Sequence, residues 1–344
     1  MPAFRHWTDG GNDTVRDMLQ KAVASMSRIL YFCPDFPQPS GGIKTLYRHV
    51  HRLVDMGFDA WIVHQKHPFR VTWHGYEAPT LWLSERPRFT PEDVLVIPEV
   101  MPQVMQQTAG FSGERIVIAL SWSPTYWNLP PGQTWPSFGI RRVITKSPLI
   151  QEYLHWSMGI EATLIHEYVT RDRYYFDQGA KRPKICYLTR KERSAAWLHQ
   201  VLLAKGAPFT RFEWMPLREL SEDEYARNLR EATVYVTTNM QEGMNTSVLE
   251  AMACGCLVVG YSGVGGGVYM EPDGPAQNCI LVENGNVPAL GQQLETVLRS
   301  LADDPDAYAR ITENGLETAR AYNDSKEEAE SLRAVFSPLL RASG

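Results

Sequence analysis

The segment 28–65 alternates short apolar runs with one amphipathic helix, and this alternation restricts the chain to few folds. Residues 28–33, RILYFC, are apolar and precede the loop PDFPQPSGG, which predicts a buried strand that ends in a loop. The next segment has its apolar positions on one helical face, ends near Gly57, and leads into a second strand, FDAWIVHQ. A strand–helix–strand unit predicts a parallel, doubly wound sheet whose ligands bind beyond the carboxyl ends of its strands.

The same pattern appears twice, and 344 residues are enough for two domains. DVLVIPEV, RIVIAL and RRVITKS continue the first sheet, and a second series begins with PKICYLTRK and includes TVYVTTN. We predict an α/β protein with two doubly wound Rossmann-like domains facing a central cleft. The first domain covers residues 1–170 and the second covers 180–322. A helical tail, 323–344, can pack back on the first domain.

Composition excludes several classes of protein. The net charge of −5 argues against a surface for nucleic acid, so no nucleic-acid partner is expected. No window reaches the apolar length of a membrane span, and residues 1–27 lack the apolar core of a secretory signal. The five cysteines are odd in number and lie mostly in apolar runs, which favours reduced thiols and a cytoplasmic location. For Cys254 and Cys256 we favour two small core residues over a metal site.

The stretch NMQEGMNTSVLE, residues 239–250, shows what the second domain can bind. TVYVTTN is a predicted strand, and a helix should begin near Asn245 or Thr246 at the carboxyl edge of the sheet. The start of a helix leaves backbone N–H groups unpaired and favours negative charge, so a phosphate fits there. Glu250, further along the helix, can accept hydrogen bonds from a ribose diol, and Glu242 can bind hydroxyls on the other side. Phosphates between two diols describe a nucleotide sugar.

Two stretches resemble a known family. EGMNTSVLEAMACGCLVV is similar to the E-x7-E segment of retaining glycosyltransferases with the GT-B fold, the glycosyl transferases group 1. SGGIKTLYRHVHRLVDMGFDAWIV resembles the double-glycine loop, first helix and second strand of that family. The resemblance covers most of residues 28–325.

The resemblance implies roles for individual residues. Glu250 would bind the ribose, and Glu242, Arg190 and Lys191 would be catalytic. The second cation of the family falls near Ala195 here, so Lys191 or Arg193 would replace it. The full set of implied donor-binding residues is Gly41, Gly42, Arg190, Lys191, Arg193, Gly243, Met244, Asn245, Thr246, Ser247 and Glu250.

The acceptor side departs from the family pattern. IALSWSPTYW has Ser121 and Trp122 where the family often has a histidine, and IHEYV replaces the usual PNG. Aromatic faces bind sugar rings, so some tryptophans of the first domain's loops and strand ends can line an acceptor groove. The candidates are Trp73, Trp82, Trp122, Trp127 and Trp135, and we assign Trp122 and Trp127 to the groove. The plain alternative is core packing for the tryptophans, and a solvated helix cap and surface acid for Glu242 and Glu250.

The resemblance further implies transfer with retention of configuration and without a metal or other cofactor. The departing phosphate would take the acceptor's proton, and cations and the helix end would balance its charge. The acceptor can be a glycan, a lipid-linked sugar or a small molecule.

Three alternatives stay open: a degenerate partner or regulatory subunit, a sugar epimerase or phosphorylase, and an NAD-dependent oxidoreductase. GVGGGVY follows a strand but no helix is evident after it, as a dinucleotide motif requires. We do not favour peripheral membrane contact.

Overall fold

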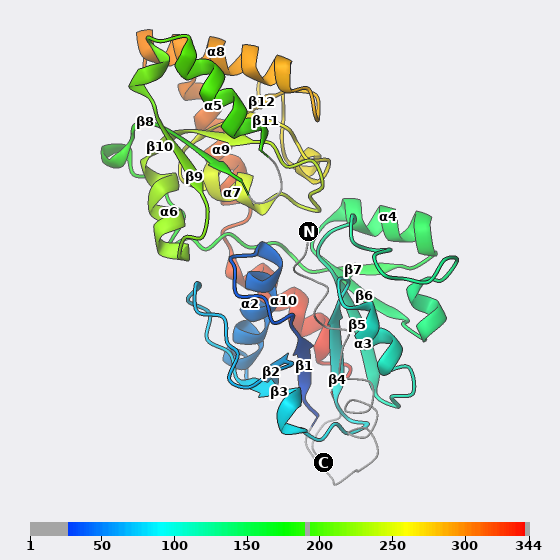
Figure 1. Cartoon of the computed structure of the whole chain (residues 1–344). Coiled ribbons are helices and arrows are strands. Elements are labelled where there is room, and N and C mark those ends of the chain that lie inside the picture. Colours follow the sequence, from blue (N-terminus) through cyan, green and yellow to red (C-terminus); the bar gives the residue numbers. More distant parts are fainter. Residues whose placement is uncertain (1–26, 190–192, 341–344) are drawn as a thin grey trace. The chain divides into compact units, whose positions relative to one another are not determined.

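The computed structural model describes residues 27–189 and 193–340 (Figure 1). These residues divide into two units. One lies within Met1–His166 and Lys326–Gly344, and the other within Glu167–Ser325. The chain therefore passes from the first unit to the second at His166 and returns after Ser325, so that its last described helix belongs to the first unit.

The first unit is built on a parallel sheet of seven strands, in the order β3-β2-β1-β4-β5-β6-β7. Its strands are β1 (Ile29–Phe32), β2 (Ala60–His64), β3 (Thr80–Trp82), β4 (Val94–Pro98), β5 (Glu114–Ala119), β6 (Arg142–Thr145) and β7 (Ala162–Leu164). Its helices are α2 (Gly41–Asp55), α3 (Pro102–Gln107), α4 (Pro148–Met158) and α10 (Ser325–Phe336), with short 3-10 turns Leu83–Glu85 and Trp135–Phe138. The strand order reverses between β1 and β4, as in a Rossmann fold.

Side chains alternate across this sheet, and each face has its own core. Leu30 and Phe32 of β1 belong to the core that α3 and α4 cover, whereas Ile29 and Tyr31 belong to the core that α2 and α10 cover. Both faces of the strands are therefore apolar, which explains why the strands appear in the sequence as continuous apolar runs.

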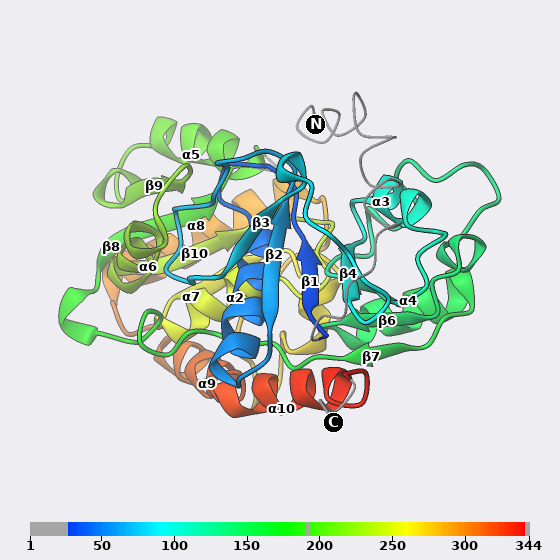
Figure 2. The same ribbon diagram turned by 90° about the horizontal axis from the view of Figure 1, so that it is seen from below.

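An ion pair buried in the first unit joins the helix α10 to α2. Arg48 Nε donates a hydrogen bond to Glu328 Oε1 over 2.7 Å, and the two side chains are 2% and 0% exposed. Arg52 and His49 of α2 also lie beside this carboxylate. Figure 2 shows α10 (red) beside α2. Leu332 and Phe336 of α10 add apolar contacts to the same core.

The second unit is built on a five-stranded parallel sheet, in the order β12-β11-β10-β8-β9. Its strands are β8 (Arg182–Leu188), β9 (Glu213–Leu217), β10 (Ala232–Thr237), β11 (Leu257–Gly260) and β12 (Ile280–Leu281). Its helices are α5 (Ser194–Ala204), α6 (Glu222–Glu231), α7 (Thr246–Ala253), α8 (Val287–Asp303) and α9 (Ala309–Arg320), with 3-10 turns Gln178–Ala180, Phe209–Arg211 and Gly265–Val268. α5 and α8 cover one face, and α6, α7 and α9 cover the other.

Both units are thus mixed α/β with parallel sheets, and the predicted fold class is confirmed. The sequence SEDE, residues 221–224, predicts a capping box of Ser221 and Glu224, and this box is present at the start of α6. One local expectation was wrong: Gly41 and Gly42 do not end a loop but form the first two residues of α2.

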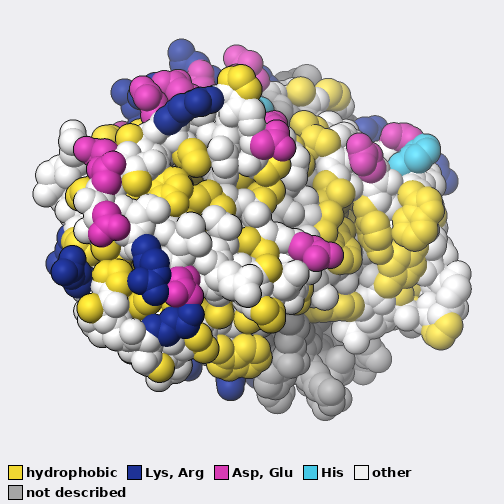
Figure 3. Space-filling model, turned by 90° about the horizontal axis from the view of Figure 1, so that it is seen from above, with side chains coloured by type: hydrophobic (Ala, Val, Ile, Leu, Met, Phe, Trp, Pro, Cys, Tyr) yellow, Lys and Arg dark blue, Asp and Glu magenta, His cyan; other side chains and the backbone are white. Residues whose placement is uncertain are grey.

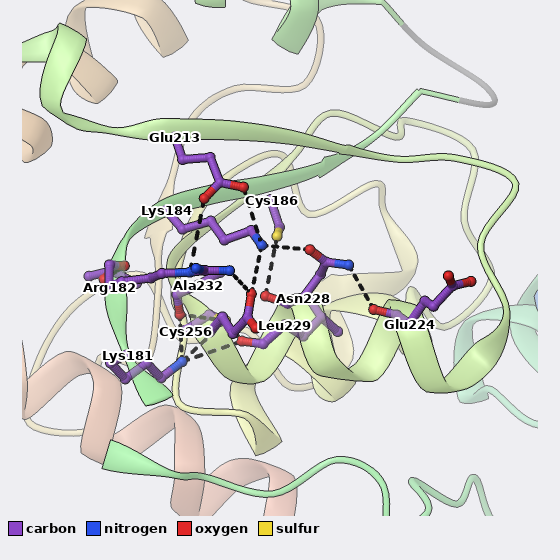
Figure 4. A network of polar contacts seen from close by, with 12 residues as sticks. Lys181, Arg182, Lys184, Cys186, Glu213, Glu224, Asn228, Leu229, Ala232 and Cys256 are labelled. Atoms are coloured by element: carbon purple, nitrogen blue, oxygen red, sulfur yellow. Dashed lines mark hydrogen bonds and ion pairs between the residues drawn. The ribbon is translucent and has the colours of Figure 1, made fainter. Parts of the chain in front are cut away.

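A polar network anchors the amino-terminal edge of the second sheet (Figure 4). Lys184, 2% exposed, donates to Asn228 Oδ1 over 2.6 Å and to Glu231 Oε2 over 2.8 Å. Cys256 donates to the backbone oxygen of Leu229 over 3.2 Å. Because β8 begins and α6 ends here, the network fixes the helix to the sheet at the edge opposite to the one where α7 begins.

The five cysteines agree with the expectation from composition. All five cysteines are buried and none forms a disulfide. Within residues 27–189 and 193–340, no helix combines the length and apolar character needed to cross a membrane.

Candidate functional site

The second sheet has its topological switch point between β8 and β10, because β9 lies on one side of this pair and β11 on the other. Ligands of doubly wound sheets bind at the carboxyl ends of strands at such a point. β10 ends at Thr237, and α7 begins at Thr246. The predicted helix start at Asn245 or Thr246 is confirmed. The segment between strand and helix therefore lies where a ligand of this unit would bind.

Asn245 precedes α7 in the left-handed conformation, with φ 54° and ψ 48°, and its side chain does not cap the helix. Its amide instead lies 3.4 Å from Thr237 Oγ1 and 3.4 Å from the backbone oxygen of Ser262. The Ser247 hydroxyl donates to Asn245 Oδ1 over 3.1 Å, and the Tyr269 hydroxyl donates to the Asn245 backbone oxygen over 2.8 Å. The residue that usually satisfies the first N–H groups of a helix is thus held away from them.

A glycine-rich loop after β11 lies directly against this segment. A Cβ on Gly265 would lie 2.4 Å from the backbone carbon of Gly243, and one on Gly263 would lie 2.5 Å from the backbone oxygen of Asn239. Two hydrogen bonds of 3.1 Å, from Glu242 N to Gly263 O and from Gly265 N to Glu242 O, join the two backbones. Only glycine permits this approach. From the sequence we compared GVGGGVY only with a dinucleotide-binding motif. In the structure its glycines hold the 239–243 segment.

The two glutamates differ in their surroundings. Glu242 is half-buried and pairs with Val264 of the glycine-rich loop in an isolated parallel bridge. Glu250 is 5% exposed and lies on α7 facing Tyr225 of α6. Burial raises the pKa of Tyr225 well above its usual value, and the charge of Glu250 and a hydrogen bond to it raise that pKa further. Glu250 is therefore not a solvated surface acid, and Tyr225 is a neighbour that sequence reasoning missed.

A third buried acid lies at the start of α7. Glu167, 2% exposed, accepts a hydrogen bond from the Thr246 hydroxyl over 2.9 Å and one from the Tyr168 N–H over 3.0 Å. Glu167 lies in IHEYV, the segment that replaces PNG. An acid within that apolar segment was the available signal, but its partner is 79 residues away.

The structure does not describe most of the basic residues that were predicted to bind the diphosphate. Arg190 and Lys191 lie outside the described residues. Arg193 is exposed and immediately precedes α5, in the connection that follows the carboxyl end of β8. This connection and the β10–α7 segment leave the sheet at the same switch point. Arg193 therefore lies at the carboxyl edge of the sheet, the edge where α7 begins.

In the first unit, the switch point between β1 and β4 brings together a glycine pair and a buried acid. A Cβ on Gly41 would meet nothing within 4 Å, and one on Gly42 would meet only ordinary contacts, so packing within the unit does not require glycine at either position. Glu99, 4% exposed, follows β4 and accepts N–H groups from Leu120 over 3.0 Å and Ser121 over 2.9 Å. Sequence reasoning did not identify Glu99.

Burial raises the pKa of Glu99 from 4.5 to about 7. The backbone N–H bonds and the charge of Lys146 oppose this rise without cancelling it. The strand register places Glu99 in line with Ala119 and Thr145, because Pro98 pairs with Ile118 and Ala119 pairs with Thr145.

Three tryptophans of the first unit differ in burial. Trp135 is 0% exposed and belongs to the core beneath α3 and α4, so it cannot line a groove. Trp122 and Trp127 are half-buried in the segment after β5. Two cavities of the unit, of about 290 and 210 Å³, lie elsewhere, around the amino-terminal ends of β4, β5 and β6.

We predict that Gly265→Ala lowers the free energy of unfolding by about 2 kcal/mol, because the added methyl group meets the Gly243 backbone. Gly267→Ala is the matched control, since a Cβ there meets nothing within 4 Å. Urea denaturation of both variants checks this. Equal stabilities would show that the two loops are not held as described.

The pKa of Glu99 predicts a pH-dependent stability. The folded value, about 7, lies above the ordinary 4.5, so the stability that this group contributes is fully present below about pH 4.5 and is lost as the pH rises through 7. Glu99→Gln keeps the acceptor oxygen and cannot ionise. We compare the free energy of unfolding of the variant with that of the wild type at two pH values. The advantage of the variant should be larger at pH 8.5 than at pH 4.5, on the order of 3 kcal/mol. A difference that does not change with pH would contradict the assignment.

Comparison with known proteins supports the same reading. Residues 190–300 match the model of the family glycosyl transferases group 1. An α-1,6-glucosyltransferase of Actinobacillus pleuropneumoniae serotype 7 is 24% identical over 243 residues, which cover 68% of this chain and 72% of that protein.

Solved structures share the fold at low identity. Sucrose-phosphate synthase from Thermosynechococcus elongatus superposes with a TM-score of 0.70 at 15% identity, covering 91% of this chain and 99% of that one. HepE from Anabaena, solved in complex with UDP-glucose, superposes with a TM-score of 0.68 at 13% identity, covering 91% and 100%. These similarities support a glycosyltransferase with the GT-B fold, and residues 190–300 match the model of the group 1 family.

Proposed function

We propose that the protein transfers glucose from UDP-glucose to an acceptor hydroxyl, with retention of configuration and without a metal ion. The observation that carries the proposal is the start of α7. There the N-cap side chain of Asn245 is turned away from the helix, and the buried carboxylate of Glu250 lies on the same helix. UDP-glucose is chosen because HepE was solved with it and because the curated relative is a glucosyltransferase.

The diphosphate would accept hydrogen bonds from backbone N–H groups in the first turn of α7. The helix dipole and the aligned N–H groups stabilise negative charge at this end without any side-chain rearrangement. The glycine-rich loop keeps the 239–243 backbone close enough to contact the donor sugar. Glu242 lies in that backbone segment and would accept hydrogen bonds from hydroxyls of the sugar. Glu250, beside Tyr225, would accept hydrogen bonds from the ribose hydroxyls.

The transfer step needs charge stabilisation on the leaving group. The acceptor oxygen forms a bond to C1 of glucose as the bond from C1 to the β-phosphate oxygen breaks. The acceptor's proton passes to that phosphate oxygen on the same face, and UDP leaves. Arg190, Lys191 and Arg193 are proposed to share the developing charge with the end of α7.

An Asp-x-Asp sequence can present a metal ion to a diphosphate. The position of Asp304 and Asp306, which form such a sequence here, supports the proposal of transfer without a metal ion. Both residues are exposed in the turn after α8, and the backbone N–H of Asp306 donates to Asp304 Oδ1 over 3.0 Å. Because α8 follows β12 and runs antiparallel to the sheet, its end lies at the amino-terminal edge. This placement is opposite to the start of α7.

We expect UDP-glucose to bind the wild-type chain in the presence of EDTA, and Glu250→Gln to bind it about tenfold more weakly or worse. The loss of a charged hydrogen-bond acceptor for the ribose hydroxyls weakens binding by about this factor. Glu313→Gln, a change of an exposed glutamate on α9, is the control and should bind normally. Isothermal titration calorimetry measures all three. Equal affinities for the two variants would remove Glu250 from the site, and binding that needs a divalent ion would refute metal independence.

Retention predicts the anomer of the first product. With the α-linked donor UDP-glucose, proton NMR of the reaction, recorded before any mutarotation, should show an α-linked glucoside or α-glucose. A β-anomer appearing first would show inversion and would rule out the same-face proton transfer.

A further inference from the structure

Three aromatic rings form a continuous row on the surface of the first unit. The rings of Trp122 and Tyr153 have centroids 6.0 Å apart at an interplanar angle of 58°, and those of Tyr153 and Trp156 lie 5.9 Å apart at 52°. Trp156 is 79% exposed, whereas Tyr153 and Trp122 are half-buried. The row therefore runs from open solvent toward the body of the unit. We call it the aromatic row.

The helix α4 and the segment after β5 together build this row. Tyr153 and Trp156 are three positions apart on α4 and so share one helical face. The Tyr126 hydroxyl donates to the backbone oxygen of Ser157 over 2.5 Å, which ties the β5 segment to the end of α4. Figure 3 shows hydrophobic side chains gathered at the right of the view, where α4 lies in Figure 1. Singly exposed apolar residues are common, but a connected row of large rings is not.

The inner end of the row reaches the carboxyl edge of the first sheet. Trp122 stands between Ser121 and Ser123, whose hydroxyls lie 3.3 Å apart. The Ser121 N–H donates to Glu99, the buried acid at the switch point of this unit. A ligand lying along the row would thus have aromatic faces beneath it and hydroxyl and carboxyl groups at one end. This combination suits a sugar chain, whose rings have apolar faces and hydroxyl edges.

Charge argues against a membrane surface as the occupant. Helices that lie on anionic membranes carry lysine and arginine around their apolar face. α4, Pro148–Met158, has no lysine or arginine and has one acid, Glu152.

We propose that Trp122, Tyr153 and Trp156 bind an oligosaccharide acceptor, with successive sugar rings against successive aromatic rings and the reacting end toward Glu99. This inference rests on the proposed function and narrows its acceptor from any hydroxyl compound to a glycan. It adds Tyr153 and Trp156 to Trp122, which the sequence had suggested.

The test measures how binding depends on glycan length. Saturation-transfer NMR on the full chain with saturating UDP uses isomalto-, malto- and cello-oligosaccharides from the monosaccharide to the pentasaccharide as probes. In at least one series, the wild type should bind the tri- or pentasaccharide about tenfold more tightly than the monosaccharide, because added rings reach Tyr153 and Trp156. Trp156→Ala should abolish this gain while leaving the affinity for UDP and for the monosaccharide unchanged.

Trp197→Ala is the matched control, since Trp197 is another exposed tryptophan, 58% exposed, on α5 of the second unit. Affinity that does not depend on length in any series, or an equal effect of the two variants, would overturn the inference. Binding of the wild type to phosphatidylglycerol vesicles that Trp156→Ala abolishes, without glycan binding, would assign the row to a membrane and would also overturn it. Failure of the proposed function is distinct, because the chain would then not bind UDP at all.

Discussion

The candidate site depends on a helix that its N-cap side chain does not cap. Asn245 stands at the N-cap of α7 in a left-handed conformation, and the Thr237 hydroxyl and the Ser262 carbonyl hold its amide away from the helix. A side chain that capped the helix would satisfy the N–H groups that an anionic ligand needs. The surrounding structure holds Asn245 in this conformation: the Tyr269 hydroxyl bonds its carbonyl, and the Ser247 hydroxyl bonds its side chain.

Tight backbone packing supports the start of this helix. The glycine-rich loop after β11 contacts the segment before α7 so closely that Gly263 and Gly265 cannot carry a side chain without displacing it. At the opposite edge of the sheet, Lys184 and its partners fix α6 to β8. The sheet is thus fixed at its amino-terminal edge, and at its carboxyl edge backbone contacts position the loops. Glu250 on α7 and Tyr225 on α6 lie between these two fixed edges of the sheet.

The sequence predicted the elements better than the contacts between them. The start of α7, the capping box at Ser221 and the two α/β units follow from local patterns of cap residues, apolar periodicity and turn residues. The contact of Glu167 with Thr246 joins positions far apart in the chain, and no local pattern shows it. Tyr225 was missed as a partner of Glu250 for the same reason. Trp135 illustrates the opposite error, because an aromatic residue in a loop-like segment is fully buried in the core.

A crystal structure of the full chain with UDP-glucose tests the central claim most directly. The account predicts diphosphate oxygens within about 3 Å of backbone N–H groups in the first turn of α7, and ribose hydroxyls on Glu250. A diphosphate bound elsewhere, with no ligand at the start of α7, would contradict it.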